Sequence, residues 1–409
     1  MTLAGLAWRY LWARPLVAAL NLLMLALGVA AMVFVSLTSE QVDAHMRRGL
    51  QGIDLVVGAK GSPLQLILAG VFHLDAPSGN IPLESVQALR DQPLVARVVP
   101  LALGDNLRGF RIVGTEPAYL EVHGAVLREG QLWQAPLQAV LGAEVATSLR
   151  LGPGARFNGS HGLSQQGPAH AQTPYTVSGV LAPCACVLDR LVLTSLESVW
   201  AVHELAHEPK HEPAHAGEDK HEDAADAPRE VSLLLVSYHS PLAAMSLPRW
   251  VNAQPALQAA APALESARLL RMVGVGVELL RGAAGVLLAV AALSVFVALT
   301  HAVREREPDL AMLRMLGARA WRIAALPLLE AFWLATLGLV LGLLLGHAMV
   351  HVLGQVLREQ QSLPLTAAWW TPTVLLLAAG VFVLAAVAAL VPSWRCFRLD
   401  VTRLLQAPR

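Results

Sequence analysis

The sequence predicts an α-helical membrane protein with four transmembrane helices and a large α+β domain inserted between helices 1 and 2. The chain of 409 residues is 55% hydrophobic and only 15% charged, and its mean hydropathy is positive. This composition is too apolar for an ordinary soluble protein. Four apolar runs have the length of about 20 residues that a helix needs to cross a bilayer. The segment 38–271 lies between the first and second runs and contains no such run.

The order of elements along the chain follows from these runs. Residues 1–14 carry apolar, aromatic and basic groups at the spacing of a helix that lies in the membrane interface. The predicted spans are 15–37, 281–301, 323–350 and 371–392. The charged segment 302–322 separates the second and third spans, the short loop 351–370 separates the third and fourth, and the tail 393–409 follows.

Arginine predicts the orientation of the chain. The loop between the second and third spans contains five arginines, namely Arg304, Arg306, Arg314, Arg319 and Arg322. Short loops rich in Lys and Arg stay on the cytoplasmic side of a membrane. The N-terminal segment and the tail are basic as well, whereas the loop 351–370 has one basic residue, Arg358. We therefore expect both termini in the cytoplasm and the segment 38–271 on the opposite side.

The insert has the pattern of an α+β domain. Short apolar, β-branched runs predict strands at 53–57, 96–103, 110–113, 175–181, 190–193 and 231–238, and helical patterns occur at 82–91 and 142–151. Turn residues separate these runs, for example Gly104-Asp105-Asn106 and Gly152-Pro153-Gly154. The flanking segments 39–50 and 256–271 are expected to be helical stalks that lead from and to the membrane.

The charged loop 302–322 predicts a short amphipathic helix, with Pro308 near its start and Gly317 at its end. On physical grounds alone it is an interfacial helix whose arginines neutralise lipid phosphate. The residues of this loop and of the following span allow a more specific interpretation. Glu307, the run 313–318 (LRMLGA), Glu330 and the spaced glycines Gly338, Gly342 and Gly346 resemble the cytoplasmic loop and third span of MacB/FtsX-type (LolC/E-like) permeases of ABC transporters. Segments 54–61, 140–154 and 389–405 also resemble this family.

The resemblance implies a function. The chain would be a permease subunit in a bacterial inner membrane, paired with a second permease copy, and the insert would be periplasmic. Its loop would act as the coupling helix that contacts a separate ABC ATPase and passes ATP-driven motion outward, to export or extract an envelope substrate such as a lipoprotein or to act on another periplasmic protein. The resemblance assigns contact with the ATPase to Glu305, Glu307, Leu310, Leu313, Arg314, Leu316, Gly317 and Ala318. A non-transporting signal transducer or activator of the same architecture is the alternative.

Other function classes are disfavoured by what the sequence lacks. No G-x-x-x-x-G-K-[ST] occurs, and a P-loop needs that lysine for the phosphates and that hydroxyl for magnesium. We therefore expect no enzymatic activity and no directly bound cofactor in this chain, with ATP and magnesium on the partner. The formal net charge is zero, so no basic footprint for nucleic acid is present.

Histidines give the insert its most unusual feature. His203, His207, His211 and His215 repeat every four residues, with His221 beyond, in a polar segment 203–228 that is expected to be a mobile loop. Imidazoles suit zinc and other divalent transition metals. His161 and His170 lie in a second glycine-rich loop and can join them. The sequence leaves open whether these seven histidines bind metal or are incidental to a polar loop.

The same segment contains His203-Glu204-Leu205-Ala206-His207, which matches the H-E-x-x-H motif of zinc proteases. Such a protease needs an ordered helix, a third ligand and a shaped cleft, and Pro209 follows the motif closely. A membrane zinc protease is therefore only a remote alternative.

Two further features carry expectations. Glu330, early in the third span, is expected to pair with Arg319 or Arg322 near the cytoplasmic surface. Cys184 and Cys186 lie two positions apart in the insert, where they can oxidise, bind metal, pair with another chain or fill apolar space.

Overall fold

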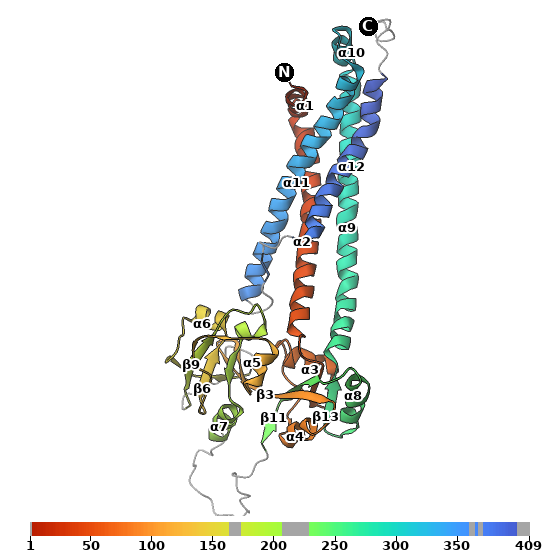
Figure 1. The fold of residues 1–409 in the computed structure, drawn as a ribbon. Coiled ribbons are helices and arrows are strands. Elements are labelled where there is room, and N and C mark those ends of the chain that lie inside the picture. Colours follow the sequence, from red (N-terminus) through yellow and green to blue (C-terminus); the bar gives the residue numbers. More distant parts are fainter. Residues whose placement is uncertain (1, 163–172, 207–228, 360–364, 367–370, 399–409) are drawn as a thin grey trace, which may run out of the picture. The chain divides into compact units, whose positions relative to one another are not determined.

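The computed structural model describes residues 2–162, 173–206, 229–359, 365–366 and 371–398 (Figure 1). Two compact units are formed. One, the helical unit, consists of Met1–Asp43 and Met272–Arg409, and the other, the α+β unit, of Ala44–Arg271.

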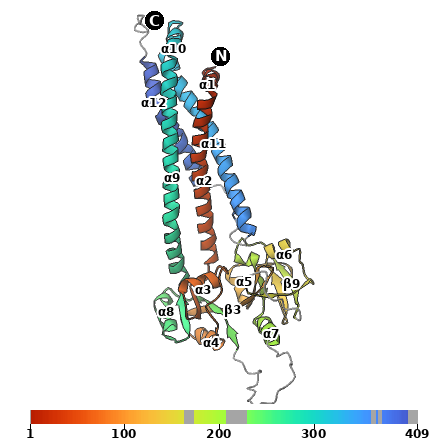
Figure 2. The same ribbon diagram turned by 180° about the vertical axis from the view of Figure 1, so that it is seen from behind.

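Six helices run through or lie within the helical unit: α1 Leu3–Trp12, α2 Pro15–Gly49, α9 Pro262–Glu305, α10 Glu307–Met315, α11 Ala320–Glu359 and α12 Pro372–Phe397. Among the described residues, four helices (α2, α9, α11 and α12) are long and apolar enough to span a membrane. They run alongside one another in both views of the ribbon (Figures 1 and 2). The predicted fold class is thereby confirmed, since the α+β unit lies between the first and second of these helices in the sequence.

A row of glycines lets α11 pack closely on α2. Each glycine lies against one apolar side chain of α2, in the pairs Gly338 with Leu25, Gly342 with Val29 and Gly346 with Val33. A Cβ atom built on any of the three would come within 2.8 Å of its partner side chain. The spacing of four residues places all three glycines on one face of the helix. Asn21, the main polar residue of the first span, receives a hydrogen bond of 2.6 Å from Ser294 Oγ of α9.

The α+β unit is built on one mixed sheet. In the described residues the sheet has eleven strands, and its main path runs β13-β1-β12-β3-β4-β10-β6-β9-β5, with β7 beside β9 and β8 beside β3. The bounds are β1 Leu55–Ala59, β3 Val95–Leu107, β4 Phe110–Thr115, β5 Leu127–Gly130, β6 Gln138–Leu141, β7 Arg156–Phe157, β8 Ser160–His161, β9 Tyr175–Leu181, β10 Val192–Thr194, β12 Leu233–Tyr238 and β13 Leu257–Ala260. Most neighbours are antiparallel, whereas β4 with β10 and β6 with β9 are parallel. A small second sheet pairs β2 Ile81–Pro82 with β11 Glu230–Val231.

Short helices pack around the sheet: α3 Pro63–Gly70, α4 Glu84–Arg90, α5 Ala118–Val122, α6 Ala143–Leu149, the 3-10 helix Val187–Arg190, α7 Leu196–Ala206 and α8 Ala243–Ala253. Every residue of β4 is buried, because a central strand is covered on both faces. The α+β assignment of the insert is therefore confirmed.

Two local predictions for the insert were wrong. Gly104-Asp105-Asn106, predicted as a turn, lies inside β3, where the register to β4 shifts between Leu103 and Asp105. The actual turn is Arg108-Gly109, both with positive φ, and its amide at Gly109 donates to Asn106 Oδ1 at 2.8 Å. The segment 256–271, predicted as helix throughout, begins with strand β13, and α9 starts only at Pro262.

Candidate functional site

Helix α10 occupies the middle of the charged loop. Pro308 stands in its first turn, and Gly317, with a φ of +94°, ends the segment, as predicted from the sequence. Leu310 and Ala311 are buried. Leu310 lies in an apolar cluster with Ala7 of α1 and Ile323 of α11. One side of α10 is thus anchored to the helical unit.

The opposite side of α10 carries apolar side chains that are exposed in the single chain. Met312 is 57% exposed, Met315 is 54% exposed and Leu316, just after the helix, is 80% exposed. Their spacing of three and four residues places them on adjacent positions of one face. We call Met312, Met315 and Leu316 the outer face of α10.

The residues assigned to ATPase contact by resemblance fall into two groups. Glu305, Leu316 and Gly317 are exposed, whereas Leu310 is buried and Glu307, Leu313, Arg314 and Ala318 are partly buried. Leu313 and Ala318 pack against the same cluster as Leu310. Leu310 therefore holds the helix in place, and contact of this set with an ATPase stays a prediction. The sequence reading missed Met312 and Met315, although their i,i+3 spacing was visible.

Arg306 connects α10 to the rest of the helical unit. Its Nη1 donates to Glu330 Oε1 of α11 at 2.7 Å, and its Nη2 donates to the Tyr10 carbonyl of α1 at 2.8 Å. The guanidinium lies 4.3 Å from the centre of the Tyr10 ring. The expected pairing of Glu330 with Arg319 or Arg322 is thus wrong, since tertiary packing brings Arg306 to this carboxylate instead.

Two further contacts surround α10. Glu305, the last residue of α9, forms an ion pair with Arg14. Arg314 Nη1 donates to the Phe397 carbonyl at the end of α12 at 3.5 Å. Arg14, which precedes the first span, and Phe397, at the end of the fourth, therefore both contact the charged loop.

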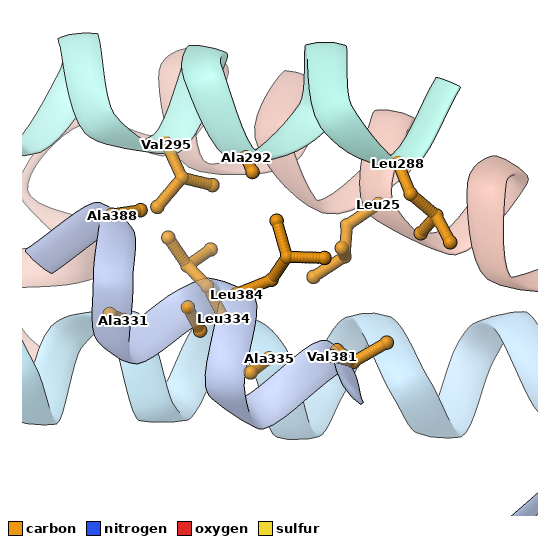
Figure 3. A pocket seen from close by; sticks show the side chains of 11 residues that line it. Leu25, Leu288, Ala292, Val295, Ala331, Leu334, Ala335, Val381, Leu384 and Ala388 are labelled. Atoms are coloured by element: carbon orange, nitrogen blue, oxygen red, sulfur yellow. The ribbon is translucent and has the colours of Figure 1, made fainter. Parts of the chain in front are cut away.

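A small apolar cavity lies among the four candidate spans. Side chains from α2, α9, α11 and α12 surround a cavity of about 20 Å³, and Figure 3 shows Leu25, Leu288, Leu334 and Leu384 around it. All eleven lining residues are apolar. A second pocket of about 310 Å³ lies among α1, α2, α9 and α11, and its lining includes the polar residues Asn21, Arg306 and Glu330.

In the α+β unit, two of the seven predicted metal-binding histidines come together. His161 of β8 and His203 of α7 lie beside Asp105 of β3, and their potential ligand atoms are all within 4.8 Å of one another. His170, His207, His211, His215 and His221 lie outside the described residues. The sequence reading missed Asp105 because it placed this residue in a turn; an isolated glycine within a strand pattern, here Gly104, was the available signal for a bulge.

The H-E-x-x-H motif begins at His203 on α7, which ends at Ala206, and His207 lies outside the described residues. Cys184 and Cys186 form a disulfide with each other, and the Cys184 amide donates to Asp189 Oδ1 at 3.0 Å.

These features define a multispanning membrane protein with a large α+β domain between its first two spans and an amphipathic helix between its second and third. Two family models match the chain: a MacB-like periplasmic core domain over residues 18–208 and an FtsX-like permease C-terminal domain over residues 281–401. Together they span most of the sequence. The chain belongs to the MacB/FtsX-like family of ABC-transporter permeases, whose members work with an ATPase partner.

Solved structures resemble the α+β part only distantly. The periplasmic region of MacB from Actinobacillus actinomycetemcomitans is 13% identical, covers 54% of this chain and 95% of its own, and has a TM-score of 0.35. The extracellular domain of the noncanonic ABC-type transporter YknZ from Gram-positive bacteria is 14% identical, covers 51% of this chain and 98% of its own, and has a TM-score of 0.31. No curated protein matches the sequence.

Proposed function

We propose that this chain is the permease subunit that transmits the motion of a separate ABC ATPase to its own α+β domain. In this proposal the chain lies in a bacterial inner membrane, with both termini and α10 in the cytoplasm and the α+β domain in the periplasm. A second permease copy completes the complex, and ATP is hydrolysed on the partner. The domain acts on an envelope substrate, such as a lipoprotein or another periplasmic protein.

The outer face of α10 is the observation that carries the proposal. Met312, Met315 and Leu316 are all more than half exposed, although they lie on a helix whose other side is packed against the spans. Burying one such side chain contributes about 1.5–3 kcal/mol. Burial of two such side chains therefore strengthens binding of a partner roughly a hundredfold. Replacing both is expected to weaken ATPase binding by about the same factor.

A movement imposed on α10 has a physical route into the spans. Arg306 bonds to Glu330 of α11 and to the Tyr10 carbonyl, with the Arg306 and Glu330 side chains only 16% and 7% exposed. Breaking such a buried pair costs about 3–5 kcal/mol. Displacement of the loop is therefore expected to carry α11 and α1 along rather than to shear the loop away.

Two long helices support transmission over distance. Helix α2 has 35 residues and α9 has 44, which at 1.5 Å per residue corresponds to about 52 Å and 66 Å. The apolar core of a bilayer is about 30 Å thick. Both helices are therefore longer than a span requires, and each continues without interruption from the helical unit into the sequence of the α+β unit.

Co-purification tests the proposal. The full-length chain, a Met315→Asp/Leu316→Asp variant and a Leu242→Asp/Met245→Asp control are each purified in detergent with the ABC ATPase encoded beside the permease. The control replaces a leucine and a methionine that are 68% and 69% exposed in the α+β unit, so it adds the same charge elsewhere. We expect wild type and control to retain the ATPase and the α10 variant to lose it. Equal retention by all three chains would refute the assignment of α10.

A further inference from the structure

Three elements of the α+β unit bring one ligand each to a common point. Asp105 lies on β3, His161 on β8 and His203 on α7. Strand β8 pairs with β3 so that His161 stands opposite Asp105 in the register, which places the two side chains within reach of each other. The ring of His203 approaches the same stretch of β3, because its Nε2 lies 3.4 Å from where a Cβ of Gly104 would be.

The distances between the three side chains are close to those between the ligands of a metal ion. His161 Nδ1 lies 3.1 Å from Asp105 Oδ1, and the rings of His161 and His203 lie 5.1 Å apart between centroids. All three ligand atoms fall within 4.8 Å of one another. Bonds from these atoms to a zinc ion placed among them would be about 2.0–2.2 Å long.

The backbone around the cluster is held by a buried side chain. Asn106, fully buried, donates from Nδ2 to the Ser160 carbonyl at 3.1 Å and to the Gly162 carbonyl at 2.8 Å. The Gly162 amide donates to the Gly104 carbonyl at 2.9 Å. These bonds surround His161 on both sides in the sequence, so the position of its ring relative to Asp105 is built into the fold.

The burial of Asp105 favours a cation at this point. The Asp105 side chain is 2% exposed, whereas that of His161 is 37% exposed, so a carboxylate lies at the inner end of a cluster that is open on the outside. A buried carboxylate needs a positive partner.

We propose that Asp105, His161 and His203 bind a divalent transition-metal ion, with zinc as the first candidate. Two imidazoles and one carboxylate suit zinc, copper, nickel or ferrous iron, whereas calcium and magnesium prefer oxygen ligands throughout. Three protein ligands leave a coordination position for water or for an exchangeable ligand. The ion would link β3, β8 and the C-terminal part of α7, at the start of the histidine-rich segment 203–228. This site does not depend on the proposed coupling to an ATPase.

Metal titration of the tag-free, full-length chain in detergent tests the site. The background variant carries asparagine in place of His170, His207, His211, His215 and His221, so that binding by these histidines is removed. We expect it to bind one zinc ion per chain in calorimetry and to give visible d–d absorption with cobalt. His203→Ala and Asp105→Asn should lower the zinc affinity at least a hundredfold, because even residues behind the ligands change it about 10–100-fold.

Controls separate the site from the alternatives. His239→Ala removes an exposed histidine of the same unit and should leave zinc binding unchanged. If Asp105→Asn does not fold, His161→Gln decides, since the His161 side chain is more than one third exposed. No zinc binding by the background variant would show that Asp105 and His161 form an ion pair only, and would overturn the proposal. If His161→Gln and His203→Ala both bind zinc as tightly as the background variant does, the proposal is overturned as well.

Discussion

Replacing Gly342 by alanine is expected to separate α11 from α2. The added Cβ would lie 2.5 Å from Val29 Cβ and 2.9 Å from the Ala26 carbonyl oxygen. Ordinary contacts of this kind are about 3.4–4.0 Å, so the helices must move apart by about 1 Å. The carbonyl belongs to the backbone of α2 and cannot rotate away as a side chain does.

The size of the effect follows from two opposing terms. Forcing an extra methyl group into a well-packed contact costs about 1–3 kcal/mol, and the shift also loosens the neighbouring contacts of Gly338 and Gly346. Alanine in a helix, however, gains about 0.5–1 kcal/mol over glycine. Gly380 of α12 is the matched control, because a Cβ there meets nothing within 4 Å and only the favourable term applies. Because the helix term is common to both variants, we expect them to differ by the overpacking term, about 1–3 kcal/mol.

Unfolding of the full-length chain by SDS in mixed micelles measures this difference. Gly342→Ala should unfold at a lower SDS fraction than wild type, and Gly380→Ala at the same or a higher one. Should Gly342→Ala match Gly380→Ala, the close approach of α2 and α11 would be refuted, and the glycine spacing would need another explanation.

Three further predictions follow from single contacts. Glu330→Gln leaves the buried Arg306 without its counter-charge and should destabilise the helical unit by about 3–5 kcal/mol in the same SDS assay; a double Arg306→Gln/Glu330→Gln variant should recover part of this loss, and additive losses would contradict the pairing. His73, completely buried and 2.9 Å from the Tyr119 hydroxyl, has its pKa lowered from 6.5 to about 3 by burial and by nearby Arg111. As the pH falls, the unfolded chain binds a proton at His73 before the folded chain does. The contribution of neutral His73 to stability is therefore complete above pH 6.5 and falls by about 1.4 kcal/mol per pH unit below it. Stability measured by hydrogen exchange in β4 should differ less between pH 7 and pH 5 in His73→Asn than in wild type, and an equal difference would refute this role of His73. Asn106→Ala should lower zinc affinity about 10–100-fold in the calorimetric assay, whereas an unchanged affinity would mean that Asn106 does not position His161.

Most predictions that rest on one continuous stretch of chain agree with the structure, although those for 104–106 and 256–271 were wrong. The four apolar runs became the four candidate spans, because length and hydropathy are properties of a segment by itself. Pro308 and Gly317 delimited α10 for the same reason, since the backbone preferences of proline and glycine act locally. Short apolar, β-branched runs likewise located β4, β9 and β12 to within a few residues.

Predictions that needed a partner distant in the sequence failed or were incomplete. Arg319 and Arg322 were the nearest arginines to Glu330 along the chain, yet Arg306 reaches it because α9 and α11 pack together. Which side of α10 is exposed likewise followed only from the packing of Leu310 against Ala7 of α1 and Ile323 of α11.

The sequence by itself determined that this protein has four helices long and apolar enough to span a membrane, an α+β domain after the first and an amphipathic helix after the second. Those properties depend on composition and on spacing within one segment. Only the tertiary structure decided that Asp105 lies in β3 and faces His161 and His203. Strand register is set by packing of the whole sheet, and a shift of one residue would turn Asp105 to the opposite face.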